Sequence, residues 1–555
     1  MLRLPVAQIG LLILAAALFA ANAVSACPYC STNKNYLETL PTELMEGRGN
    51  YHHAVSTKNA EAQAYFDQGL TMCFAFNHDE AIRSFCKAAS LDSNLAMAHW
   101  GIAFALGTNY NRPMDTLQAA GAWDELQKAR ALMPFASQQE RDYIEALSKR
   151  YWSDPKADYS QFEASYSAAM KALSAKYPDD LDAATFYAES KMNLKPWQLW
   201  TRDGKPADGT EEILAVLESV MKRNPNHPGA NHYYIHAVEA SNDPGRALPS
   251  AKRLPELVPA AGHLIHMPAH TYIRLGDYAG SIKANRAAVK VDSAYVATGG
   301  LGFYGLAYYS HNMHFLAVSC AFAGRYKEAM ELTTRLENHL FPFANADPMV
   351  GGILPTRYFI LTKFQKWDEI LATNIPDSGL AIMQTFRHFA RGMAYAAKGN
   401  LTSARDEFAA FEAAEKTMPE VCIIGAINDA RRATEIARHM LRAKIAEAEG
   451  NSAAAIGHLQ HAVAAQDTLS YDEPEGWYIN SRVALGKLLI KDNKFVDAEK
   501  TFREELLHHP HSGWALFGLW EALKAQGREK DAAAVKSEFE KSWEIADIEL
   551  TLGSL

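Results

Sequence analysis

The chain has 555 residues, of which 48% are hydrophobic, and its formal net charge is -9. A single compact core rarely reaches this size, so several domains or an array of repeats are expected. The basic residues are dispersed along the sequence rather than gathered in a patch, which argues against a nucleic-acid partner.

The first 26 residues are predicted to be a cleaved signal peptide. Arg3 supplies a positive start, residues 9–21 form an apolar run, and Val24-Ser25-Ala26 ends in the small residues typical of a cleavage site. The mature chain is therefore expected to be exported, either periplasmic or secreted. In an alternative interpretation, Val24 to Cys27 resembles a bacterial lipobox, and a lipid on Cys27 would tether the protein to a membrane. No later apolar run is long enough to span a membrane.

The next segment, residues 27–58, is predicted to be irregular and polar. Cys27 and Cys30 have the spacing of a redox pair, but no βαβ pattern follows them. A local disulfide in an exported protein is therefore the favoured interpretation of this pair, unless Cys27 carries a lipid. The other four cysteines fall in helical patterns and are expected to be small buried residues.

From residue 61 onward the apolar residues have helical periodicity, broken every 12 to 20 residues or so by glycine, proline or aspartate-rich turns. Gly392, Tyr395, Gly399, Ala404 and Phe408 follow the offsets of the tetratricopeptide (TPR) repeat, and the chain resembles that family. Further copies are anchored at Gly69 with Phe85, Gly276 with Tyr278, Gly324 with Tyr326, Gly450 with Ala462, Gly486 with Phe502, and Gly527 with Ala532. The predicted fold is an all-α solenoid of helix-turn-helix repeats, in which small residues let paired helices approach and aromatic side chains fill the space between them.

The repeat pattern weakens between residues 345 and 381, so a soft boundary is predicted there. It separates a histidine-rich N-terminal array, residues 59–344, from a C-terminal array, residues 382–555. Several histidine-rich stretches, including His266-Met-Pro-Ala-His270 and His311-Asn-Met-His314, also resemble exported bacterial repeat proteins. That resemblance implies a fold and assigns no activity.

Seven of the twenty histidines fall in three short stretches with regular spacing. They are His232, His236, His263, His266, His270, His311 and His314. His232 precedes His266 by 34 residues, which is the period of the repeat, and His236 precedes His270 by the same interval. The His263 to His311 and His266 to His314 intervals are both 48 residues, because a glycine-rich insertion falls between them.

The resemblance to TPR proteins implies that these seven histidines and Glu239 occupy positions 2, 5, 9 and 12 of the first helices, which line the concave surface. Residues four apart share one face of a helix, so His232 with His236, and His266 with His270, are each able to share a metal ion. We therefore predict a polyhistidine metal site along one groove. Imidazole ligands with one carboxylate suit copper or zinc, with iron as a third choice.

Seven histidines exceed the ligands of one tetrahedral ion, which predicts two metals or one metal with a free general base. Glu239 is the candidate base, and Glu189 is a further candidate for the same groove. The function predicted first is a metalloprotein, as a metal-dependent hydrolase or oxidase acting on a small molecule or peptide in the groove. The alternatives are a metal-free scaffold that binds a peptide or partner protein, and a protein of metal storage or delivery.

Overall fold

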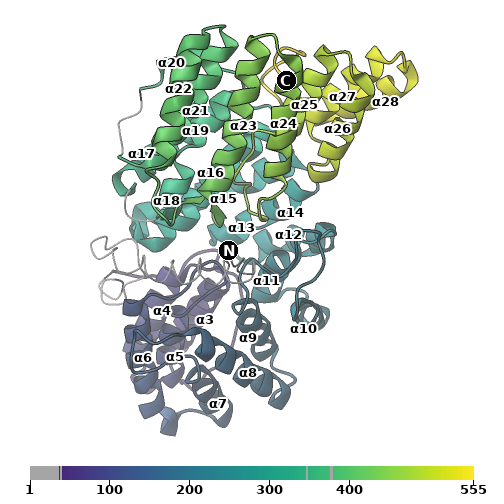
Figure 1. Ribbon diagram of the computed structural model, residues 1–555. Helices are drawn as coiled ribbons and strands as arrows, with labels where there is room; N and C mark the ends of the chain where they lie inside the picture. The colour runs from purple at the N-terminus through teal and green to yellow at the C-terminus, as the bar shows by residue number, and fades with distance from the viewer. Residues whose placement is uncertain (1–36, 38–39, 345–347, 375–378) are drawn as a thin grey trace, which may run out of the picture. The chain divides into compact units, whose positions relative to one another are not determined.

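The computed structural model describes residues 37, 40–344, 348–374 and 379–555 (Figure 1). The predicted signal peptide, the lipobox and the Cys27–Cys30 pair lie outside the described residues. Within the described ranges, no helix is long and apolar enough to cross a membrane.

The described residues are almost wholly helical, which confirms the all-α prediction, and they form two compact units. We call one the histidine unit; it comprises the described residues up to 271 together with 284–312. The second unit comprises residues 272–283 and the described residues from 313 onward. The predicted connection at 345–381 falls inside the second unit, and its role as a domain boundary stays a prediction.

The histidine unit is built from successive helices that pack as neighbours in sequence order. Its helices are α3 (Ala60–Phe74), α4 (His78–Leu91), α5 (Ala96–Ala105), α6 (Thr116–Ala131), α7 (Gln138–Leu147), α8 (Ser160–Lys176), α9 (Leu181–Met192), α10 (Thr210–Arg223), α11 (Pro228–Val238), α12 (Leu248–Leu257) and α13 (Gly262–His266). Short 3-10 turns lie at Met133–Phe135 and Pro244–Ala247. Three further helices are shared in sequence between the two units: α14 (Pro268–Arg274), α15 (Tyr278–Gly299) and α16 (Gly302–Phe322).

The second unit continues with helix pairs such as α21 with α22, α23 with α24, and α27 with α28. Its remaining helices are α17 (Tyr326–Leu340), α18 (Pro348–Ile353), α19 (Thr356–Lys363), α20 (Trp367–Ala372), α21 (Ala381–Ala397), α22 (Leu401–Glu415), α23 (Ala430–Ala448), α24 (Ser452–Gln466), α25 (Ser481–Lys491), α26 (Phe495–His508), α27 (Gly513–Ala525) and α28 (Glu529–Ser542), with a 3-10 turn at Phe341–Phe343. The strands β1 (Ile423–Ile424) and β2 (Asn428–Asp429) form a two-residue antiparallel pair.

Glycine and phenylalanine at the predicted repeat anchors hold the helices of a pair together. A Cβ added at Gly69 on α3 would lie 2.6 Å from the ring of Phe85 on α4. A Cβ at Gly101 on α5 would lie 2.7 Å from the same ring. Phe85 is fully buried between these two glycines, so the predicted pairing of small and aromatic residues is confirmed at this point of the array.

Candidate metal centre

Helix α11 carries the first histidine pair. Pro228 stands at its first position, where the missing N–H removes no helical hydrogen bond, and the side chain of His227 caps the helix by accepting from Ala230 N–H. His232 and His236 then follow one turn apart on the same face, with ring centroids 4.9 Å apart. The two imidazoles therefore share one face of the helix, as predicted, with their ring planes tilted by 53°.

The second set of histidines lies on two short helices rather than on one continuous helix. Pro268 has no N–H to donate, and α13 ends at His266, after which α14 begins at Pro268. His263 and His266 lie on α13 and His270 on α14. Despite this break, the Nε2 atoms of His266 and His270 lie 2.8 Å apart.

The last two histidines lie on α16, which is 21 residues long. The extra residues of the 48-residue spacing are taken up by α15 and α16, so the predicted glycine-rich insertion is mostly helical. His311 belongs to the histidine unit, and its Nε2 lies 3.1 Å from the Nε2 of His266. His314 belongs to the second unit, where its ring contacts Tyr478 at a centroid distance of 6.2 Å.

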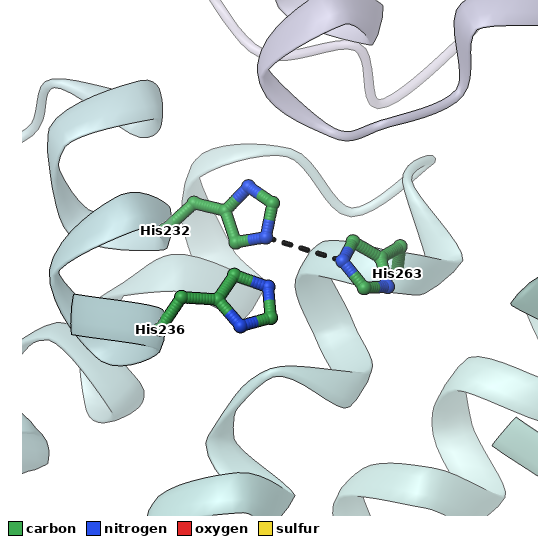
Figure 2. Close-up of side chains that lie close together, drawn as sticks. All are labelled: His232, His236 and His263. Carbon is green, nitrogen blue, oxygen red and sulfur yellow. Dashed lines mark hydrogen bonds between the residues drawn. The ribbon is translucent and has the colours of Figure 1, made fainter. Parts of the chain in front are cut away.

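Six of the seven predicted histidines form two groups of three. In the first triad, His232, His236 and His263 each offer a ring nitrogen, and these atoms lie within 4.8 Å of one another. Figure 2 shows the rings of His232 and His236, one above the other on α11, facing His263 from α13; the Nε2 atoms of His232 and His263 are 3.1 Å apart. His266, His270 and His311 form the second triad by the same criterion. Among the described residues, His314 belongs to neither triad, and its role as a ligand stays a prediction.

Glu239 lies between the two triads. Its Oε1 is 3.1 Å from Nδ1 of His236 in the first triad, and its Oε2 is 2.7 Å from Nδ1 of His270 in the second. Although burial opposes ionisation of this carboxyl, the two histidines lower the pKa of Glu239 to about 2. The residue predicted as a general base is therefore an ionised carboxylate that orients one histidine of each triad.

Other groups fix the direction of two more rings. Nδ1 of His232 donates to the backbone carbonyl of Phe74 at the end of α3, at 2.5 Å. Nδ1 of His266 lies 2.5 Å from Oδ1 of Asn285 on α15. Because a carbonyl oxygen only accepts, the proton of each neutral ring resides on Nδ1 and the lone pair on Nε2. In metal sites the ring nitrogen that does not bind the ion is held by such a partner.

The triads are buried, whereas the sequence predicted an open concave surface. His232, His236, His263, His266 and His270 are each at most 2% exposed, and only His311 is partly exposed. Aromatic rings surround the first triad: Phe76 lies 4.5 Å from the ring of His232, and Tyr308 lies 4.9 Å from that of His263. Tyr110 lies 5.4 Å from the ring of His236. The prediction of a solvent-lined groove at these residues is therefore wrong, because other helices of the same unit cover them.

Burial also keeps the rings uncharged. It lowers the pKa of His232, His263 and His266 well below the usual value, and nearby histidines lower it further. Burial likewise lowers the pKa of His270, although Glu239 opposes that shift. At neutral pH these imidazoles are therefore neutral, which is the form that binds metal.

Two nitrogens of the first triad are buried and have no hydrogen-bond partner in the described part of the chain, Nε2 of His236 and Nδ1 of His263. Buried polar atoms are normally satisfied, and leaving one unpaired costs on the order of 1–3 kcal/mol. In the neutral form of His236, Nε2 carries the lone pair, because Nδ1 of the same ring faces the carboxylate of Glu239. A cation in the first triad would satisfy this atom.

One supporting feature had no sequence signal. Tyr304 on α16 accepts from the backbone N–H of His263 at 3.0 Å and donates to the buried carboxyl of Asp292 on α15 at 2.9 Å. Asp292 also lies so close to Gly262 that an added Cβ would be 1.9 Å from its Oδ1. These contacts fix the start of α13, and two of them could not be foreseen because they join α13 to residues 30 and 41 positions away.

Glu189, the further candidate for the groove, lies away from both triads by the contacts it makes. It is buried on α9 and accepts from Asn193, and burial raises its pKa to about 7. Tyr233 packs against Phe74 and Phe76, and its ring also lies 5.3 Å from that of His232. Glu189 belongs to no group of metal-ligating side chains among the described residues.

The second unit contains further histidines with close partners. His509 is buried between Glu475 and Glu505, whose charges overcome the opposing effect of burial and raise its pKa to about 10. His439, His458 and His461 lie on neighbouring helices. The structure places the ring of His439 on α23 5.7 Å from His458 and 5.1 Å from His461 on α24.

No known protein family matches the sequence, and no curated protein matches it. Solved structures similar to the chain include a human IFIT1 dimer with m7Gppp-AAAA, at 13% identity over 87% of this chain and 90% of that one, with a TM-score of 0.34. Ypp1 is 8% identical over 88% and 82% of the two chains, with a TM-score of 0.41. The TPR domain of P58(IPK) is 12% identical over 85% and 99%, with a TM-score of 0.22. The identities and TM-scores are low, so the function of this chain has to be argued from its own residues.

Proposed function

We propose that the histidine unit binds two transition-metal ions, one in each triad. The observation that carries this proposal is the pair His266 and His270, whose Nε2 atoms lie 2.8 Å apart. In both rings Nδ1 lies next to an oxygen atom: Oδ1 of Asn285 for His266, and Oε2 of Glu239 for His270. Two lone pairs therefore face each other, and only a cation between them makes the contact favourable.

A metal ion fits that position better than a proton does. A proton would create a charged imidazolium, and burial lowers the pKa of both rings. A metal takes both lone pairs and leaves the rings neutral. In the first triad the support is different: Nε2 of His236 is buried without a hydrogen-bond partner in the described part of the chain, and Nε2 of His263 lies 3.1 Å from Nε2 of His232.

Copper and zinc are the leading candidates for the ions, with iron as the third. Each triad offers three imidazoles, a set that suits copper, zinc, iron and nickel rather than calcium or magnesium. Glu239 is engaged through both oxygens by histidine Nδ1 atoms, so it acts on the ions through the rings it orients. An exported location, which residues 1–26 predict, would bring the site to metals supplied outside the cytoplasm.

A metal-free scaffold is the second candidate function, because arrays of helix pairs present extended surfaces that bind peptides and partner proteins. Its specific support is the helix-pair architecture of both units. The buried triads do not serve that role, because a peptide on the surface would not reach side chains that are at most 2% exposed. Metal storage or delivery is the remaining alternative and shares the same two sites.

The test is the metal content of protein purified without an affinity His-tag, measured by elemental analysis after exposure to copper or zinc. We expect about two ions per chain. His270→Gln should lower the content, while His508→Ala, at an exposed histidine of α26, should leave it unchanged. Circular dichroism of each variant separates a lost ligand from a lost fold. A wild-type chain that is folded yet holds no stoichiometric metal would leave the scaffold as the better account.

A further inference from the structure

The two triads differ in their access to solvent. In the second triad His311 is partly exposed, whereas all three histidines of the first triad are at most 2% exposed. Phe76, Tyr110 and Tyr308 are themselves buried, and they pack against the rings of the first triad. An ion can therefore reach the second triad from solvent at His311, but to reach the first triad it has to pass other buried side chains.

Rings of the two triads lie at the separation at which two imidazoles share one ion. When metal–nitrogen bonds are about 2 Å long, two imidazoles on one tetrahedral ion have ring centroids about 5 Å apart. The centroids of His263 and His266, one from each triad, are 5.7 Å apart, and those of His236 and His270 are 5.5 Å apart. Centroids inside the triads are 4.7 to 6.1 Å apart, so the gap between the triads is no wider than the gaps within them.

Glu239 adds a carboxylate where the triads meet. With His236 and His270 it forms a third group of side chains, which we call the junction, whose ligand atoms lie within 4.8 Å of one another. Its oxygens are 3.1 Å from Nδ1 of His236 and 2.7 Å from Nδ1 of His270. Ligand atoms around one tetrahedral ion are about 3.3 Å apart, so a small movement of these side chains admits an ion. In each ring the proton then resides on Nε2, so that Nδ1 offers its lone pair.

Resting on the proposed two-metal function, we infer that ions enter at His311 and fill the first triad by way of the second triad and the junction. An ion held by the second triad passes from His270 to His236 at the junction and then joins the other ligands of the first triad. It exchanges one ligand at a time and stays bound to at least one histidine, so no bare ion crosses the apolar interior, where its charge would be costly. The second triad is the entry site and the first is the inner site.

The experiment follows the uptake of Co(II), which is coloured when bound, by the full metal-free chain in a stopped-flow spectrometer. Two variants keep one triad each. His232→Gln keeps the second triad and should load its one ion quickly. His311→Gln keeps the first triad and should load its ion about 10- to 1000-fold more slowly, because access then needs a minor open state, and such states are populated at about 0.1–10%. Circular dichroism confirms that both variants are folded.

Equal loading rates in the two variants would mean that each triad has its own access, which overturns the inference and leaves the two-metal proposal standing. A wild-type chain that binds no metal ion would defeat both. His314→Gln is the matched control on α16, since His314 belongs to the second unit and contacts Tyr478. It should take up both ions at the wild-type rates.

Glu239→Asp tests the junction itself. The shorter side chain keeps the charge, but one carboxylate can no longer contact both His236 and His270. The wild-type chain should load in a fast phase for the second triad and a slower phase for the first, and the variant should slow the second phase at least several-fold while the fast phase is kept. A carboxylate that only positions the two rings would affect both triads alike, so an unchanged ratio of the two rates would remove the junction from the route.

Discussion

His266 and His270 stand on two different short helices, yet their Nε2 atoms are 2.8 Å apart and both rings direct their other nitrogen at an oxygen atom. Without a cation, the repulsion between the two Nε2 lone pairs destabilises the folded state. A cation bound by both nitrogens would turn the same contact into a stabilising one. The metal is therefore expected to contribute to stability as well as to chemistry, because an ion that binds only the folded state shifts the unfolding equilibrium toward it.

The first prediction follows from that coupling. Removing metal with a chelator should lower the Tm of the wild-type chain, and adding copper or zinc back should restore it. In His266→Gln/His270→Gln the chelator should change the Tm much less, because the facing lone pairs are gone and the second triad holds no ion. Differential scanning calorimetry with and without chelator measures both. An identical chelator effect in the two proteins would mean that the stabilising ion binds elsewhere.

The second prediction separates the two histidines of α16. His311→Gln should reduce the metal content by about one ion per chain, because His311 completes the second triad. His314→Gln should leave it at the wild-type value, because His314 belongs to the second unit and contacts Tyr478. Burial lowers the pKa of His314 to about 3, so it is a neutral packing residue. The regular spacing of the sequence predicts loss in both variants, so equal losses would restore that interpretation.

The third prediction concerns Glu239 as a positioning residue. Glu239→Gln removes the charge and turns one oxygen into a donor that cannot accept from a histidine Nδ1. Metal affinity should fall by about 10- to 100-fold, as is usual when a partner of a metal-bound histidine is lost. Glu189→Gln is the matched control, since this buried carboxyl contacts Asn193 and neither triad. Competition with a chelator of known affinity measures both; equal affinities in the two variants would remove the role given to Glu239.

The sequence predicted the helix pairs, and six of the seven histidines that it selected converge in the two triads. Periodicity places His232 and His236 on one helical face, and the repeat then places His266 and His270 in register with them. The sequence did not predict the burial of these histidines, because that burial depends on contacts between segments that are distant in the chain. The carbonyl of Phe74 and the ring of Phe76 come from a helix end more than 150 residues before His232, and they turn an expected surface into a buried site.

His314 shows a second limit of reasoning from spacing. The interval from His266 to His314 equals the interval from His263 to His311, so the pattern treats the two pairs alike. Spacing fixes the position of a residue along a helix, but the packing of α16 determines which side chains of that helix meet the triads. A pattern in one helix cannot supply that information.

The fourth prediction tests the repeat anchors. Gly69→Ala should destabilise the chain by about 1–3 kcal/mol, because the added Cβ would lie 2.6 Å from the ring of buried Phe85. Gly399→Ala is a poorer comparison, since Gly399 has a positive φ of 76°. Gly457→Ala in α24 is the better control, because nothing lies within 4 Å of its added Cβ and alanine favours a helix. Urea unfolding followed by circular dichroism should give a loss of stability for Gly69→Ala and none for Gly457→Ala.

The fifth prediction concerns pH and the segment that precedes α3. His53 Nδ1 lies 2.6 Å from Asp182 on α9, and Asp182 also faces Nε2 of His227 at 3.1 Å. Burial opposes the charge on His53, but the hydrogen bond and charge of Asp182, with Asp180 and Asp67 nearby, raise its pKa to about 9. The folded-state pKa is thus above the unfolded value of about 6.5. The protonated ring therefore stabilises the fold fully below about pH 6.5, and this contribution is lost as the pH rises through about 9.

The matched pair for this test is His53→Gln and His52→Gln. At pH 6 the His53 variant should be less stable than wild type by roughly 3 kcal/mol, which is the free energy of a shift of this size. The difference should shrink as the pH rises and nearly vanish at pH 10. The side chain of His52 is 60% exposed beside Asp67, so His52→Gln should change stability little at any pH. Urea unfolding of metal-free protein between pH 6 and 10 measures the difference; a His53 effect that stays constant over this range would show that its contribution comes from packing and not from charge.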